Sequence, residues 1–204
     1  MKITVFGATG RVGQELVKKA LADGHQVKVL VRSFKLEDHA DLEMIKGDVR
    51  NQKDVELAIQ GAEAVFSALG TDRTTTLSEA MPLIIEAMRK QGIQRLISIG
   101  TAGILNSRLT AGVLRYQGGD SNRKLTFAAE EHEKAYRLLE ASDLDWTVVC
   151  PTYLPDGEAR GGYRTEKDFL PEEGKEITVG DTADFAYEQL GSSDFLKSRA
   201  GISY

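Results

Sequence analysis

Three glycines near the start of the chain constrain its fold more than any other feature. Residues 3–6 form a short β-branched and apolar run, which leads directly into Gly7-Ala8-Thr9-Gly10-Arg11-Val12-Gly13, and a helical pattern follows over residues 14–21. The glycines allow a sharp turn and a close approach of the backbone to a ligand, and the helix then directs its unpaired N–H groups toward phosphates. This order of strand, turn and helix predicts a dinucleotide-binding βαβ unit. The contacts expected from it are Gly7, Thr9, Gly10, Val12 and Gly13.

Length and composition are ordinary for a soluble globular protein. The 204 residues are 41% hydrophobic and 28% charged, enough for one domain over residues 1–204 with a small substrate-side region at about 151–204. A net charge of −5 without a dense basic stretch argues against a nucleic-acid partner. No signal peptide, membrane partner or metal site is expected, and the oligomeric state is left open. The lone cysteine, Cys150, fits a reducing cytoplasm, which is the expected location.

Strand-like and helix-like segments alternate along most of the chain. Strands are predicted at residues 26–31, 42–46, 64–69, 95–99 and 146–150, and helices at 51–59, 77–90 and 125–141. Residues 102–123 are a long loop of a kind that is usually functional. A short element at 177–179, a helix at 181–189 and a tail complete the chain. The alternation predicts an α/β fold, a doubly wound parallel sheet in three layers (Rossmann fold).

Ligands of such a sheet bind beyond the carboxyl ends of its strands. The residues at those ends are Arg32-Ser33, Asp48-Val49, Ala68-Leu69-Gly70, Gly100-Thr101 and Pro151-Thr152-Tyr153. A site that prefers NAD places an acidic residue after the second strand, whereas Arg32 offers a guanidinium fork to a 2′-phosphate. Arg11 would add a second positive charge at the helix start. The alternative is that both arginines are solvated surface residues. The sequence thus favours NADPH over NADH.

The chain resembles the atypical short-chain dehydrogenase/reductases, within them the biliverdin-IXβ reductase/flavin reductase-like (NmrA-like) branch. The resemblance spans essentially all 204 residues and rests on Phe6-Gly7-Ala8-Thr9-Gly10, Val29-Leu30-Val31-Arg32, Gly47-Asp48-Val49, Leu69-Gly70-Thr71 and Gly162-Tyr163. It implies that Asp48 and Val49 flank the adenine and that Leu69 and Gly70 line the ribose.

The same resemblance implies that Thr101, His132 and Tyr153 lie near the nicotinamide and the substrate. For His132, which follows Glu130 and Glu131, a place on a solvated helix face is the alternative. Tyr153 stands where the related enzymes often carry a histidine, so their substrate preference does not transfer directly.

Classical members of the wider family transfer protons with a Tyr-x-x-x-Lys pair. Tyr116 and Tyr136 are followed four residues later by acidic residues. Tyr163 and Lys167 have the required spacing, but they follow the last predicted strand, and we interpret them as a coincidence. Hydride transfer to a flavin tolerates this absence, because the flavin ring delocalises the added charge.

The sequence therefore predicts an NADPH-dependent oxidoreductase that reduces a flavin or a similar planar conjugated acceptor, with the flavin as a possible substrate. One alternative is an NmrA-like redox sensor, which binds the dinucleotide without turnover. Another is an epimerase or dehydratase, although the missing pair and the short C-terminal region argue against it.

Overall fold

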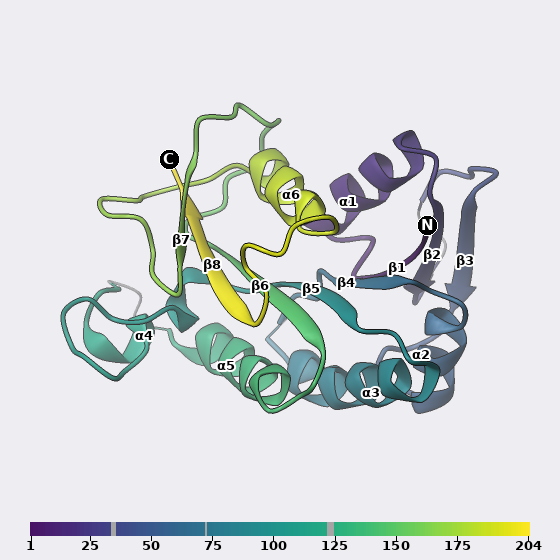
Figure 1. Ribbon diagram of the computed structural model, residues 1–204, viewed down its shortest axis with the longest axis horizontal. Coiled ribbons are helices and arrows are strands. Elements are labelled where there is room, and N and C mark those ends of the chain that lie inside the picture. Colours follow the sequence, from purple (N-terminus) through teal and green to yellow (C-terminus); the bar gives the residue numbers. More distant parts are fainter. Residues whose placement is uncertain (34–35, 72, 122–124) are drawn as a thin grey trace.

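A mainly parallel sheet runs through the centre of the computed structural model, which describes residues 1–33, 36–71, 73–121 and 125–204. Its strand order is β3-β2-β1-β4-β5-β6-β8-β7 (Figure 1). The strands are β1 (Lys2–Phe6), β2 (Gln26–Val31), β3 (Leu42–Lys46), β4 (Ala64–Ser67), β5 (Arg95–Ile99), β6 (Asp145–Pro151), β7 (Arg164–Lys167) and β8 (Ser198–Ser203). Neighbouring strands are parallel except β7, which runs antiparallel to β8. The strand order reverses between β1 and β4, where such folds bind ligands.

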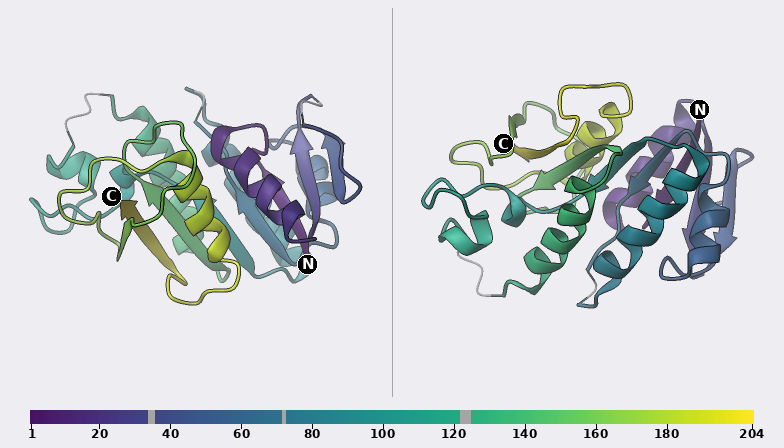
Figure 2. Two further views of the ribbon diagram at one scale, coloured as in Figure 1. Left: turned by 90° about the horizontal axis from the view of Figure 1, so that it is seen from above. Right: turned by 60° about the horizontal axis from the view of Figure 1, so that its bottom comes forward.

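Helices cover both faces of the sheet, which confirms the predicted three-layer fold. The helices α1 (Arg11–Ala22) and α6 (Val179–Glu188) lie side by side on one face, and α2 (Gln52–Ile59), α3 (Thr76–Gln91) and α5 (Phe127–Glu140) cover the other (Figures 1 and 2). A short 3₁₀ helix η1 (Ala102–Ile104) and a single turn α4 (Arg115–Gly118) lie between β5 and α5. Among the described residues, no helix has the length and apolarity needed to cross a membrane.

Apolar side chains on the two faces of the sheet form two hydrophobic cores. The core beneath α2, α3 and α5 includes Met81, Ile84, Leu96, Leu139 and Trp146. The core beneath α1 and α6 includes Leu16, Val29, Phe66, Ile97 and Phe185. Since both faces are covered, the central strands are apolar along nearly their whole length instead of alternating with polar residues.

Capping residues explain where several helices begin and end. The side chain of Asn51 accepts a hydrogen bond from the Asp54 N–H at 3.2 Å and starts α2. Gly92, with a φ of 68°, ends α3 in the left-handed conformation that glycine adopts without strain. The hydroxyl of Thr178 accepts from the Asp181 N–H at 3.2 Å and starts α6.

The structure confirms the predicted segments up to β6 to within about two residues but differs in the last fifty. The triplet 177–179 is not an element of its own, because the Thr178 hydroxyl caps α6 and Val179 is already its first helical residue. The segment 102–123 contains η1 and α4, and its residues 122 and 123 lie outside the described residues.

The tail forms β8, which pairs with β6 on one side and β7 on the other. The sequence analysis missed both strands. Apart from Ile202, residues 198–203 are small or polar and do not form a clear apolar alternation, although every one of them is buried in the folded protein. Neighbouring segments supply that burial.

Candidate functional site

A cleft of about 550 Å³ opens at the carboxyl ends of the central strands, where the strand order reverses. This volume is typical of cofactor sites. The predicted contacts that line it are Gly7, Thr9, Gly10, Arg11, Val12, Arg32, Asp48, Val49, Ala68, Leu69, Gly70 and His132. Gly13, Ser33 and Pro151 are not in its lining. The cleft thus gathers residues from both halves of the fold at one place.

The turn between β1 and α1 leaves little room for side chains. Gly7 has a φ of 77°, and a Cβ on it would lie 2.3 Å from the Ala68 carbonyl oxygen. A Cβ on Gly13 would lie 2.1 Å from the Gly7 oxygen. Gly10 is different, because its φ of −79° suits any residue and the nearest atom to an added Cβ is 3.2 Å away. The fold therefore tolerates a side chain at position 10, and the glycine there keeps the cleft open for a ligand.

The first turn of α1 presents uncapped backbone N–H groups to the cleft. Its N-cap residue, Gly10, has no side chain to accept a hydrogen bond from them, and the first turn contains no acidic residue. Arg11 and Val12, the first two helical residues, line the cleft. Unpaired N–H groups and the positive end of the helix dipole attract anions, so this end of the cleft is suited to phosphates.

Two arginines surround a carboxylate at the ends of β2 and β3. Nε and Nη2 of Arg50 donate to the two carboxylate oxygens of Asp48 at 3.1 and 2.8 Å. These bonds, together with a smaller effect of the Arg32 charge, lower the pKa of Asp48 to about 2. Because Arg50 neutralises the ionised Asp48, the carboxylate does not repel an anion that approaches Arg32.

The guanidinium of Arg11 links the cleft to the segment after β6. Its Nη1 donates to the Leu154 carbonyl oxygen and to Asp156, each at 2.8 Å. Both Arg11 and Asp156 are more than half exposed, so this ion pair is worth little to stability. The positive charge that the sequence suggested at the helix start is therefore shared with an acidic partner.

His132 lies on α5 and forms part of the cleft wall instead of the solvent-facing side of the helix. Burial lowers its pKa to about 4, and the neighbouring charge of Glu131 opposes this shift. The side chain of Glu131 points away into the protein, where it accepts from the Ser78 hydroxyl at 2.8 Å. His132 is therefore a neutral ring at pH 7.

This neutral histidine makes the protein less stable in acid. The folded-state pKa of His132, about 4, lies below the ordinary value of 6.5. The contribution of this residue to the free energy of unfolding is therefore fully present above pH 6.5 and is lost as the pH falls toward 4. We expect the free energy of unfolding to fall by about 2 kcal/mol between pH 7.5 and pH 5 because of His132, and we expect this fall to be absent in His132→Gln. Urea unfolding at both pH values measures it. The exposed-site variant His39→Gln is the control and should behave as wild type. Equal pH dependence in all three proteins would refute this role.

A second, smaller pocket is lined by residues that follow β5 and β6; we call it the side pocket. Its lining includes Thr101, Gly103, Arg115, Tyr116, Thr152 and Tyr153. It adjoins the cleft in sequence at two places, since Gly100 and Leu154 line the cleft while Thr101 and Tyr153 line the side pocket. Tyr153 is 58% exposed and leaves an aromatic surface accessible at this junction. Thr101 and Tyr153 thus line the side pocket directly next to residues of the cleft wall.

Tyr163 and Lys167 do not line either pocket. The Tyr163 ring packs edge-on against Phe185 of α6, with ring centroids 6.0 Å apart. Burial raises the pKa of Tyr163 to about 12, which makes it a poor proton donor or acceptor near neutral pH. Lys167 is an exposed residue of the edge strand β7.

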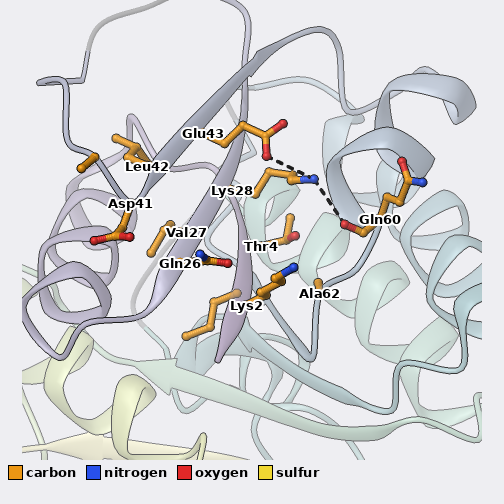
Figure 3. Close-up of a pocket in the computed structure, with 12 residues that line it drawn as sticks. Lys2, Thr4, Gln26, Val27, Lys28, Asp41, Leu42, Glu43, Gln60 and Ala62 are labelled. Atoms are coloured by element: carbon orange, nitrogen blue, oxygen red, sulfur yellow. Dashed lines mark hydrogen bonds and ion pairs between the residues drawn. The ribbon is translucent and has the colours of Figure 1, made fainter.

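A further cavity of about 350 Å³ lies at the other end of the strands from the cleft, at the amino ends of β1, β2 and β3 (Figure 3). Its central cation is Lys28, whose ammonium group lies 3.4 Å from the Glu43 carboxylate and donates to the Gln60 carbonyl oxygen at 3.2 Å (Figure 3). The protein itself satisfies this charge. The groups suited to phosphates are at the carboxyl-end cleft.

Outside the predicted strands and the quoted motifs, three residues of the cleft wall were not assigned from the sequence: Arg50, Thr76 and Leu154. Arg50 comes two residues after a predicted strand-end contact, so its position was a usable signal. Thr76 begins α3 and Leu154 follows β6, and only the packing of these segments over the sheet brings them to the cleft.

Comparison with known proteins agrees with this geometry. Residues 7–193 match the family described as NAD(P)H-binding, and the chain belongs to that family. Within the Rossmann-fold proteins it is an atypical short-chain dehydrogenase/reductase, as the sequence motifs implied.

The relatives include proteins of different described activities. The uncharacterised protein YwnB of Bacillus subtilis is 27% identical over 196 residues, which cover 93% of this chain and 91% of that protein. A candidate NADH-flavin reductase from Streptococcus pneumoniae has a TM-score of 0.83 and 26% identity, with 100% of this chain and 99% of that chain covered. A candidate epimerase from Bacteroides thetaiotaomicron has a TM-score of 0.85 and 27% identity, with coverages of 100% and 96%.

Proposed function

We propose that the protein is an NADPH-dependent reductase that reduces a flavin or a similar flat, conjugated acceptor. The observation that carries this proposal is the junction of two pockets: a cleft suited to a dinucleotide lies next to a side pocket whose lining includes an exposed tyrosine. The family assignment supports the dinucleotide, and a structural relative described as a candidate NADH-flavin reductase supports the acceptor.

The residues of the cleft fit a bound NADPH. The missing side chain at Gly10 and the uncapped first turn of α1 suit a pyrophosphate, which a side chain at position 10 would displace. Arg32, at the end of β2, would hold the 2′-phosphate. When bound, the reduced nicotinamide supplies a hydride. The protein's part is to hold the acceptor beside it, with Thr101 and Tyr153 on the acceptor side, and to exclude water between them.

Replacing Arg32 with alanine should weaken NADPH binding much more than NADH binding. A charge-assisted hydrogen bond contributes about 1.5–3 kcal/mol, so the NADPH affinity should fall roughly tenfold or more while the NADH affinity changes little. Calorimetric titration with both nucleotides measures the difference. Arg164→Ala, which removes an exposed arginine from β7, is the control. Equal losses for the two nucleotides would remove Arg32 from the phosphate site.

The side pocket has hydroxyl groups but, among the described residues that line it, no lysine beside a tyrosine. The Tyr116 hydroxyl donates to Glu133 at 2.6 Å. Burial and this bond raise the pKa of Tyr116, which is the opposite of what a lysine neighbour achieves in classical members of the family. An acceptor that delocalises the added charge within its own ring suits this site, because it needs no strong acid from the protein.

Two substitutions distinguish this mechanism from one in which a tyrosine acts as the general acid. Tyr163→Phe should change kcat by less than roughly threefold, whereas a general acid contributes about 10²–10⁴-fold. Thr101→Val, which removes a hydroxyl from the junction, should lower kcat/KM roughly two- to tenfold, the effect of one hydrogen bond. Steady-state rates with NADPH and FMN test both. A hundredfold collapse in Tyr163→Phe would mean that the tyrosine is catalytic.

The proposed function is tested by following NADPH oxidation with FMN, FAD, riboflavin and simple quinones, and with alcohols and ketones as negative controls. We expect turnover with the flat acceptors only. Tight NADPH binding without oxidation by any acceptor would instead indicate a redox sensor. Conversion of a sugar nucleotide without net NADPH consumption would indicate an epimerase, the activity described for one structural relative.

A further inference from the structure

The side pocket has a positively charged residue in its lining. Among the described residues that line it, Arg115 is the only lysine, arginine, aspartate or glutamate. It begins α4, the turn that follows the η1 segment, and it faces the same pocket as Thr101 and Tyr153. A cation in a pocket beside the proposed hydride-transfer site points to a ligand with a negative charge.

The guanidinium of Arg115 is only partly satisfied by the protein. It has five N–H donors, and of these Nη2 donates to the Asp120 carbonyl oxygen at 3.1 Å. No other group within the described part of the chain accepts from this guanidinium. Burial lowers the pKa of Arg115, and the charge of Asp120 opposes this shift only in part. Its remaining donors are therefore able to bind an anion.

The acidic residues around Arg115 are engaged with other partners. The Asp120 carboxylate accepts from the Ser107 hydroxyl and from the Arg108 N–H, the latter at 2.9 Å. Glu133 accepts from the Tyr116 hydroxyl and forms an ion pair with Arg137 at 3.3 Å. Glu130 accepts from the Thr126 hydroxyl at 2.6 Å and is exposed to solvent. None of these carboxylates lines the side pocket, so an anion there would be nearer to Arg115 than to them in the pocket lining.

The size of the side pocket limits what enters it. Its volume is about 80 Å³, which is room for a few water molecules and hence for a phosphate or carboxylate group, but not for a whole ring system. The ring of an acceptor must then lie at the junction, beside the exposed Tyr153, and only a polar appendage can extend to Arg115.

We propose that Arg115 binds an anionic group on the side chain of the acceptor, a phosphate or a carboxylate, so that the enzyme prefers a flavin with a charged tail over neutral riboflavin. This inference rests on the proposed reductase function. It adds a specificity determinant that does not touch the reacting ring.

The test compares FMN, riboflavin and an isoalloxazine with a carboxyalkyl chain at N10, in wild type and in Arg115→Gln. Flavin fluorescence titration gives the Kd without turnover, and NADPH oxidation gives KM and kcat. We expect wild type to bind FMN roughly 10- to 100-fold more tightly than riboflavin, and Arg115→Gln to lose most of this preference with little change in kcat. The carboxyalkyl flavin shows whether phosphate is required or any anion suffices.

Three controls make the result decisive. Riboflavin binding should be unchanged in Arg115→Gln, which shows that the pocket is intact. Arg115→Lys should keep part of the preference because it keeps the charge. Arg108→Gln removes a nearby arginine that is paired with Glu166 and should keep all of it. Equal binding of FMN and riboflavin by wild type would overturn only the proposed role of Arg115. Failure of the protein to reduce any flavin would overturn the proposed function.

Discussion

Gly10→Val should abolish dinucleotide binding while the protein stays folded. The backbone at Gly10 has a φ of −79° and a ψ of 165°, which valine adopts without strain. The nearest atoms to an added Cβ are the Gly7 and Ala68 carbonyl oxygens at 3.2 and 3.8 Å, so a small adjustment accommodates the side chain. The branched side chain would then fill the space in front of the first turn of α1. We expect the NADPH affinity to fall at least roughly 100-fold, about 2.7 kcal/mol.

NADPH fluorescence titration measures this loss, and circular dichroism with urea unfolding reports on the fold. The matched control is Gly191→Val, because Gly191 is exposed and has no atom within 4 Å of an added Cβ. It should keep both binding and stability. Gly13→Val is unsuitable, since its Cβ would overlap the Gly7 carbonyl group and damage the fold itself. Normal NADPH binding by folded Gly10→Val would refute the phosphate site.

Arg199→Leu should cost about 3–5 kcal/mol of unfolding free energy, the effect of breaking a buried ion pair. The Arg199 side chain is 7% exposed and lies on β8. Its guanidinium donates to Asp168 at 3.2 Å, to Asn106 at 2.8 Å and to the Ile104 carbonyl oxygen, and it stacks on the Tyr136 ring at 4.6 Å. Leucine would leave the buried Ile104 carbonyl oxygen and the half-buried Asn106 amide oxygen without this donor, and Asp168 would keep the Arg199 backbone N–H but lose the guanidinium.

Urea unfolding followed by circular dichroism gives the change in midpoint. The control is Arg137→Leu, which removes the other guanidinium that stacks on Tyr136, at 5.2 Å. Arg137 is 52% exposed and pairs with Glu133 and Glu140 on the same helix, so its loss should cost less than about 1 kcal/mol. Similar losses in the two variants would show that Arg199 does not fasten β8 to the rest of the protein.

The contrast between β8 and the first βαβ unit shows how much of this fold the sequence could predict. The strand, turn and helix of residues 2–22 depend on local signals: an apolar β-branched run, glycines at fixed spacing and a helical period. Residues 198–203 have no such pattern, and their pairing depends on β6, β7 and the contacts of Arg199. Local chemistry predicts the first kind of element, whereas tertiary contacts decide the second.

The residues of the candidate site also fall into two groups: those that a local sequence rule predicts and those that only tertiary contacts bring into place. The rule that ligands bind at the carboxyl ends of strands placed Asp48, Leu69 and most other expected contacts in the cleft wall, because parallel strands bring those ends together. Arg50 and Arg115 were missed. The role of each depends on its partners in space: Arg50 on the Asp48 carboxylate, and Arg115 on a pocket formed by segments far apart in the chain.

The central claim is that the cleft holds NADPH so that its hydride passes directly to a flavin in the same site. The most direct measurement is an anaerobic single turnover, with enzyme and NADPH premixed and FMN added, using NADPH deuterated at one or the other face of the nicotinamide C4. We expect FMN to be reduced in the enzyme complex. We also expect the reduction to be slower when deuterium occupies one face of the nicotinamide C4, and unchanged when it occupies the other. NADPH binding without FMN reduction, or a rate insensitive to deuterium on both faces, would contradict it.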